Sequence, residues 1–172
     1  GGGGGACGAA VALLSPWREV LDAASWRGLL ARGVLPKLAE GMAAFRVNPA
    51  DQKLGPVRGV LAWAGLLGME QLAALLLRTF FPRWLAALAE WLGQDPDWGE
   101  VSQWYCGWKA LLLRPAPGLI DDVAVRARFD AALHRINAAL DAEQEPDAAA
   151  AREGGADGTP PPPPPRWEGE EE

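Results

Sequence analysis

Residues 69–92 read MEQLAALLLRTFFPRWLAALAEWL, and this stretch decides the fold class. Its large apolar side chains recur at intervals of three and four residues, which predicts a long helix with one apolar stripe. Gly93 follows directly and is expected to end that helix. Pro82 lies inside the stripe, and we expect a kink there because proline removes a backbone donor and clashes with the preceding turn.

The same helical periodicity fills the rest of the middle of the chain. No stretch shows sustained alternation with period two, so strands are not needed and the expected fold class is all-α. A kink or break is expected near residues 33–36, where Gly33 and Pro36 interrupt the pattern. The other expected helices start at Pro16, at a Ser25 N-cap, at Pro56, at an Asp97 N-cap and at Asp121 or Asp122. On the last helix, the expected core face consists of Phe129, Leu133, Ile136 and Leu140.

Two landmarks recur along the chain with nearly constant spacing. Trp17, Trp63 and Trp108 lie 46 and 45 residues apart, and Pro36 and Pro82 are also 46 residues apart. A period in the forties, with a short and a long helix in each unit, is typical of stacked helical repeats. The sequence therefore predicts stacked helical hairpins of a HEAT-like or α-solenoid-like kind. The alternative is coincidence in a tryptophan-rich helical bundle.

Charge and composition divide the chain of 172 residues into three parts. The formal net charge is −6, but residues 141–172 carry ten acidic and two basic side chains, which leaves a net charge of +2 for the first 140 residues. We expect a flexible Gly/Ala-rich lead over residues 1–15, a helical domain over 16–142, and a disordered acidic, proline-rich tail over 143–172. A P-x-x-P-x-Arg pattern ends at Arg166, for which a low-complexity linker is favoured over a ligand of a proline-recognition domain.

Several function classes are disfavoured by the residues present. Cys7 and Cys106 have no partner at metal-ligand spacing and His134 is the only histidine, so no disulfide framework, metal site or cofactor is expected. None of the three serines lies in a nucleophile motif, so no enzymatic activity is expected. The longest uncharged run past the first helix, residues 59–69, is too short to span a membrane, and no membrane partner is expected.

The predicted helix over residues 98–113 is the candidate partner interface. Trp98, Trp104, Tyr105 and Trp108 crowd its surface, and they cannot all face inward because Trp104 and Tyr105 differ by about 100° around the helix axis. Exposed aromatic side chains beside cations are typical anchors of protein interfaces. We therefore predict an interface that includes these four residues and Lys109, with simple core packing as the alternative.

Two further cations complete the predicted interface. Lys37 and Arg83 each follow a proline expected to kink its helix, at equivalent positions of the proposed repeat. The alternative for both is a solvated surface cation whose aliphatic part covers apolar neighbours. Together with Lys109, they would also be the residues for direct nucleic-acid binding. RNA binding is possible but not evident, because a body of net charge +2 lacks the clustered cations that phosphate contacts need.

A series of short motifs resembles one known family along residues 15–142. The motifs occur in the family's order and spacing, and they read PWREV at 16–20, LPKL at 35–38, VNP at 47–49, FFPRWL at 80–85, WYCGWK at 104–109 and FDAAL at 129–133. They resemble the tuftelin-interacting protein group, whose C-terminal region is called the GC-rich sequence DNA-binding factor-like, or GCFC, domain.

The resemblance implies a nuclear protein of the pre-mRNA splicing machinery. Members of the family act when the intron-lariat spliceosome is disassembled, and they recruit a DEAH-box RNA helicase through a glycine-rich G-patch that lies N-terminal to the GCFC region. The five glycines at the start of this sequence lack the patterned aromatic and aliphatic residues of a G-patch. The resemblance thus implies a non-catalytic scaffold that binds other spliceosomal proteins. The alternative is a nucleic-acid-binding GCFC-type regulator of transcription or splicing.

Overall fold

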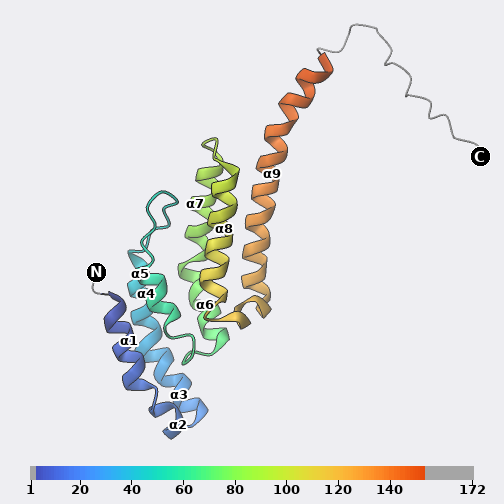
Figure 1. Ribbon diagram of the computed structural model, residues 1–172. Coiled ribbons are helices and arrows are strands. Elements are labelled where there is room, and N and C mark those ends of the chain that lie inside the picture. The colour runs from blue at the N-terminus through green and yellow to red at the C-terminus, as the bar shows by residue number, and fades with distance from the viewer. Residues whose placement is uncertain (1–2, 154–172) are drawn as a thin grey trace, which may run out of the picture. The chain divides into compact units, whose positions relative to one another are not determined.

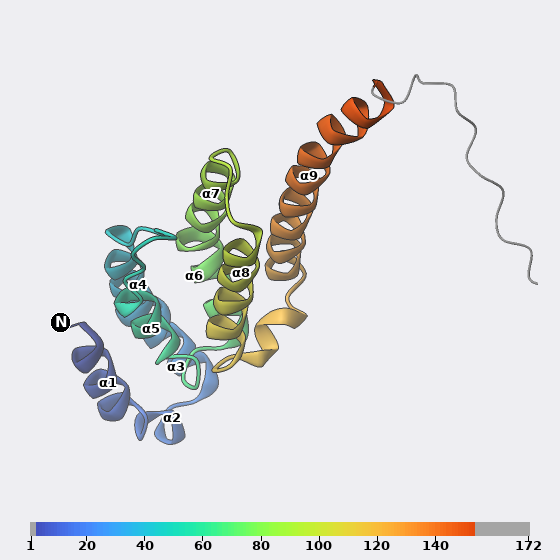
Figure 2. The same ribbon diagram turned by 45° about the horizontal axis from the view of Figure 1, so that its top comes forward.

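The computed structural model describes residues 3–153 of the chain, with side chains described from residue 8 to residue 143. All regular elements in this part are helices, as Figures 1 and 2 show from two directions, so the all-α prediction is confirmed. The chain divides into two units, 1–136 and 137–172, and every tertiary contact described below lies within the first.

The first helix, α1 (Gly3–Leu14), lies within the segment for which a flexible lead was predicted. The second half of α1 is rich in alanine and leucine, which lose little side-chain freedom in a helix. The helix also packs against α5 (Gly55–Leu61), so tertiary contact adds to local propensity. At its end, the backbone N–H and the hydroxyl of Ser15 both donate to the carbonyl of Val11, at 2.9 and 2.8 Å.

The next two helices are shorter than predicted, and the second of them begins at a different cap. They are α2 (Trp17–Val20) and α3 (Ala23–Leu29). The predicted Ser25 N-cap is wrong: Asp22 has the extended backbone of an N-cap, and its carboxylate accepts hydrogen bonds from the backbone N–H groups of Ala24 and Ser25, both at 2.9 Å. Hydrogen bonds from the side chain and backbone of Ser25 lower the pKa of the Asp22 carboxyl group.

The predicted break near residues 33–36 is confirmed. α3 continues into a π-helix, η1 (Leu30–Val34), and a new helix, α4 (Leu35–Ala43), starts with Pro36 in its first turn. Proline is tolerated there because the first helical N–H groups have no acceptor within the helix. Widened turns of this kind are frequent where the helical register changes.

The predicted helix over residues 69–92 is instead two helices. They are α6 (Met69–Thr79) and α7 (Phe81–Leu92), and their axes differ by 42°. Pro82 again lies in the first turn after the break. The buried side chains of both helices come from one apolar stripe, which includes Leu72, Leu76 and Leu88. The predicted end of α7 is confirmed, since Gly93 is its C-cap.

The last helices confirm their predicted caps but not all of their predicted faces. Asp97 accepts from the N–H of Glu100 at 2.8 Å and begins α8 (Trp98–Leu113). A 3-10 helix, η2 (Pro117–Asp121), leads to Asp122, whose carboxylate caps α9 (Val123–Glu153). The predicted core positions Phe129 and Ile136 are buried, together with Val125 and Ala132, whereas Leu133 is 39% exposed and its predicted place in the core is wrong.

The predicted boundary of the tail also moves. Residues 143–153 belong to α9 and are therefore helical, whereas the predicted disordered tail began at residue 143. Alanine and glutamate dominate this segment, and both residues favour helices. The remainder of the predicted tail, including the proline run, lies outside the described residues.

The three tryptophans that defined the predicted repeat have different environments. Trp17 is 55% exposed on α2, whereas Trp63 and Trp108 are buried, the first in the turn after α5 and the second in the middle of α8. The tryptophan register is therefore wrong as a sign of three equivalent units. Only Pro36 and Pro82 keep equivalent roles, because each lies in the first turn of a helix that follows a break.

Candidate protein-binding surface

Two of the predicted anchors on α8 lie in the core. Tyr105 and Trp108 are 6% and 4% exposed. The ring of Trp108 lies 5.0 Å from that of Phe80, and the ring of Tyr105 lies 6.2 Å from that of Phe129, measured between centroids. Both side chains thus stabilise the packing of α8 against its neighbours, so for these two residues the structure agrees with the alternative of core packing.

Trp104 lies at the edge of the same aromatic cluster. Its ring stacks on Trp84 at 5.4 Å with an interplanar angle of 10°, and it meets Trp91 nearly edge-on at 5.9 Å. Trp104 is half-buried, so part of the ring remains on the surface. Trp98 is also half-buried, at the start of α8. Of the predicted aromatic anchors, these two therefore retain accessible area.

The aromatic cluster joins three helices, α7, α8 and α9, to the residues that follow α4 and α6. Stacked and edge-to-face pairs link its rings, and such pairs add to the stabilisation from buried area. The cluster consists of Phe45, Phe80, Phe81, Trp84, Trp91, Trp104, Tyr105, Trp108 and Phe129. Figure 1 shows α7 and α8 side by side, with the start of α9 beside them. The cluster fixes the surfaces that these helices present.

The three predicted cations have different surroundings. The guanidinium of Arg83 donates to the carbonyl oxygens of Met42, Ala43 and Phe45 and so caps the end of α4. This role was missed because the partners lie about 40 residues away in the sequence. Lys109 Nζ lies 5.8 Å from the ring centroid of Phe129, within cation–π range. Lys37 is exposed on α4.

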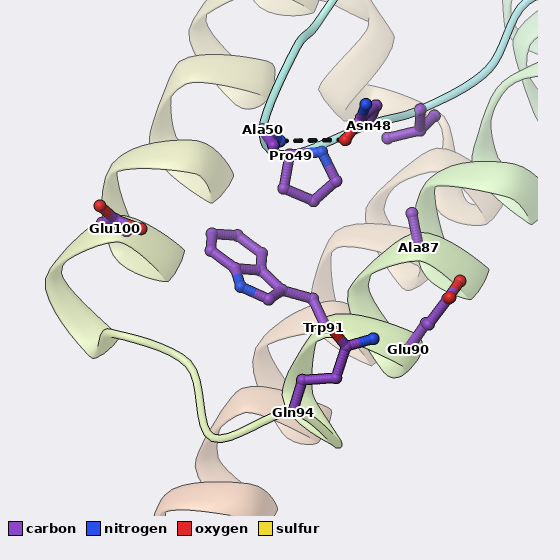
Figure 3. Close-up of a pocket in the computed structure, with 9 residues that line it drawn as sticks. Asn48, Pro49, Ala50, Ala87, Glu90, Trp91, Gln94 and Glu100 are labelled. Atoms are coloured by element: carbon purple, nitrogen blue, oxygen red, sulfur yellow. Dashed lines mark hydrogen bonds between the residues drawn. The ribbon is translucent and has the colours of Figure 1, made fainter.

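One surface pocket of about 350 Å³ lies between the loop after α4, the end of α7 and the start of α8. Figure 3 shows the indole of Trp91 pointing from α7 toward Pro49 and Ala50. The side-chain oxygen of Asn48 accepts from the N–H of Ala50 at 3.0 Å and holds this loop in a turn. Glu90 and Glu100 supply negative charge at the rim, so this pocket favours cationic or neutral groups.

A second depression runs between α5 and α8. Its larger part, about 470 Å³, is lined by Arg58, Leu61, Ala62, Gly107, Ala110, Leu111, Arg114 and Pro115. Its smaller part, about 270 Å³, is lined by Gln52, Leu54, Trp104, Gly107, Trp108 and Leu111. The two parts share Gly107 and Leu111, so they form one depression, here called the α5–α8 groove.

A third depression of about 530 Å³ separates α3 and α4 from α6. Arg27 and Arg78 line it together with Glu70, so both signs of charge are present. The N–H of the Arg27 side chain is already donated to the carbonyl of Ala23 at 3.2 Å. This depression therefore has a less defined chemical preference than the α5–α8 groove.

The described part of the chain holds no group of three or more histidine, cysteine, aspartate or glutamate side chains suited to a metal ion. Within that same part, no single helix is long and apolar enough to cross a membrane, and only the bent pair α6 and α7 passes that test when taken together.

Comparison with known families finds a match within this helical unit. Residues 6–88 match the family described as GC-rich sequence DNA-binding factor-like protein, or GCFC. Over these residues the chain is similar to the GCFC family. The predicted family resemblance is thereby confirmed.

Curated relatives extend the similarity beyond the GCFC match. Tuftelin-interacting protein 11 of Danio rerio is 34% identical over 128 residues, and the proteins of that name from Rattus norvegicus and Xenopus tropicalis are 33% and 31% identical over the same length. The aligned residues make up 74% of this chain and 15% of each relative. The chain therefore corresponds to a small part of the length of these relatives.

The α5–α8 groove has one wall inside the GCFC match and one wall after it. Arg58 and Leu61 belong to the matched residues 6–88, whereas Gly107 and Arg114 follow them. Sequence reasoning missed this groove. A signal was present, since Gly107, Ala110, Leu111 and Arg114 share one helical face, but only the packing shows that α5 lies across from it.

Proposed function

We propose that this chain is a non-catalytic protein-interaction scaffold of a nuclear pre-mRNA splicing factor that acts in disassembly of the intron-lariat spliceosome. The observation that carries the proposal is the GCFC match together with the similarity to tuftelin-interacting protein 11. That family is a splicing-factor family, and neither the GCFC nor the tuftelin-interacting group is a known enzyme family.

The physical character of the helical unit supports a scaffold. Its aromatic cluster connects α7, α8 and α9 through interlocking rings, so the outer faces of these helices keep fixed relative positions within residues 1–136. A rigid element of this kind presents preformed surfaces, and preformed surfaces lower the entropic cost of binding. Partners are proposed to be other spliceosomal proteins, and a DEAH-box helicase would be reached through a G-patch elsewhere in such a protein.

The nucleic-acid alternative is not favoured by the described residues. Of the three cations that it required, Arg83 is engaged with the carbonyl groups at the end of α4 and Lys109 lies over buried rings. Useful affinity for a duplex usually needs several clustered phosphate contacts. The protein-binding proposal needs no such cluster.

The proposal is tested by affinity purification of the tagged full chain from nuclear extract, with the bound RNA and proteins identified. We expect spliceosomal proteins and excised intron lariats, with the proteins retained after ribonuclease treatment because they contact the chain directly. Recovery that disappears with ribonuclease would instead support the nucleic-acid alternative. Recovery of no spliceosomal protein would overturn the proposal.

A further inference from the structure

The α5–α8 groove has the chemistry of a selective docking site. Leucine, alanine and tryptophan side chains line most of it, including Leu54, Leu111 and the half-buried Trp104. Only two lining side chains are charged, the arginines Arg58 and Arg114, and both line the larger part. The groove therefore offers apolar burial next to positive charge, with no carboxylate among the residues that line it.

The two arginines are available to a ligand. Both are exposed, and neither guanidinium forms a hydrogen bond or ion pair with any residue whose side chain the structure describes. Two other arginines differ in this respect. The guanidinium of Arg83 donates to backbone carbonyls at the end of α4, and that of Arg135 donates to the carbonyl of Leu85 in α7. An approaching carboxylate could thus form charge-assisted bonds without displacing an existing partner.

The shape of the groove suits a helix. One wall is the face of α8 formed by Gly107, Ala110, Leu111 and Arg114, which recur at intervals of three and four residues. A Cβ atom added at Gly107 would meet nothing within 4 Å, so there is open space beside this wall at Gly107. Small side chains at helical spacing let a third helix approach α8 closely and place aliphatic side chains between α8 and α5.

We propose that the α5–α8 groove binds an acidic amphipathic helix of a partner protein. This inference rests on the proposed scaffold function and specifies the surface through which the scaffold binds a partner. Aliphatic side chains of that helix lie over Leu54 and Leu111, and carboxylates at its flank pair with Arg58 and Arg114. This is the helix-in-groove mode of recognition, in which apolar anchors supply affinity and charge selects the partner.

The occupant is a protein helix rather than RNA. Two arginines provide too few phosphate contacts for useful RNA affinity, whereas two carboxylates are enough to select an acidic helix. The apolar lining also gains more from aliphatic side chains than from hydrated phosphates.

The test is a selection of peptides against the full chain. A displayed library of helix-forming peptides of about 16 residues, randomised along one face and its flanks, supplies the probe. We expect the selected peptides to combine aliphatic residues at helical spacing with flanking aspartate or glutamate. Failure to select any peptide, or selection of peptides without acidic enrichment, would overturn the proposal.

Variants of the groove residues then show whether the selected peptides bind in the α5–α8 groove. Double charge reversal by Arg58→Glu and Arg114→Glu should weaken binding at least about tenfold, and so should Gly107→Glu, which places a carboxylate in the open space at this position. The matched control is Arg126→Glu with Arg128→Glu, which changes the net charge equally on exposed positions of α9. Thermal unfolding of each variant shows that the fold is retained. Equal peptide binding by the groove variants and the control variant would contradict the proposal.

Two other occupants are separate outcomes. If removal of residues 154–172 strengthens peptide binding, the chain's own C-terminal segment occupies the groove, and the partner proposal is wrong. If an RNA oligonucleotide binds and the same groove variants abolish its binding, the site is a nucleic-acid site. Failure of the proposed function is distinguishable, because purification from nuclear extract with wild-type and groove-variant chains reports spliceosomal recovery independently of peptide binding.

Discussion

Arg83 shows how one side chain takes its role from a distant partner. Its guanidinium donates to three carbonyl oxygens at the end of α4, where the helix dipole leaves partial negative charge. The positions of these carbonyls depend on the chain reversal between α4 and α7. The residue that the sequence presents as a surface cation is therefore a helix cap.

Replacing Arg83 by methionine tests this role. Arg83→Met keeps the apolar stem but removes all three hydrogen bonds, so the free energy of unfolding should fall by about 1–3 kcal/mol. Lys37→Met, on the exposed face of α4, should change it by less than about 0.5 kcal/mol. Urea unfolding of both variants provides the measurement, and equal effects would contradict the capping role.

Tyr105 has an aromatic ring that stabilises the core and a hydroxyl that lacks a hydrogen-bond partner among the described groups. The ring packs against Trp84 and Phe129, while the hydroxyl oxygen is buried without a hydrogen-bond partner among the described groups. Burial raises the pKa of the Tyr105 phenol, and the negative charge of Asp130 raises it further. The folded state thus favours the neutral phenol.

Tyr105→Phe should therefore leave stability unchanged or raise it by up to about 1 kcal/mol at neutral pH. The raised pKa contributes stability below the ordinary tyrosine value of about 10, and this contribution is lost as the pH rises through the folded-state pKa. Urea unfolding at about pH 8 and pH 11 should show a smaller alkaline loss for the phenylalanine variant. Identical pH dependence in both proteins would disprove the argument.

Among the helices, α8 contains two glycines, which lower its intrinsic helix propensity. Gly107 lies in the middle of α8, and a Cβ added there would meet nothing within 4 Å. The packing of the described residues therefore does not require a glycine at this position. Gly99 lies in the first turn, where a Cβ would come to 3.0 Å from the Asp97 carboxylate that caps the helix. The two positions therefore separate propensity from steric contact within one helix.

Gly107→Ala should raise the free energy of unfolding by about 0.5–1 kcal/mol, because alanine loses less backbone entropy than glycine in a helix. Gly99→Ala should give a smaller gain or a loss, since it crowds the cap. Thermal and urea unfolding of the two variants measure the difference. A larger gain at Gly99 than at Gly107 would count against this account of α8.

Across the first unit, stability depends on the aromatic cluster. Trp84 is fully buried at its centre and contacts rings from α8 and α9. Trp17, in contrast, is 55% exposed on a helix of four residues. The two tryptophans should therefore contribute very differently to folding, although both belong to motifs that the sequence presents with equal prominence.

Trp84→Ala should lower the free energy of unfolding by about 3–5 kcal/mol, because it leaves a cavity among rings that cannot fully collapse. Trp17→Ala should cost less than about 1 kcal/mol. Urea unfolding followed by circular dichroism gives both values. Similar losses for the two variants would show that α2 contributes to the core more than its exposure indicates.

The sequence by itself determined most of the helices, because their signals are local. Asp97, Asp122 and Gly93 cap the helix ends that their positions predict, and Pro36 and Pro82 mark real breaks. The family motifs could also be recognised from the sequence alone. Tertiary structure alone decided which face of α8 is buried, what Arg83 caps, and that α5 and α8 enclose a groove. These features depend on contacts between residues about 20 to 50 positions apart, and such contacts leave no period in the sequence.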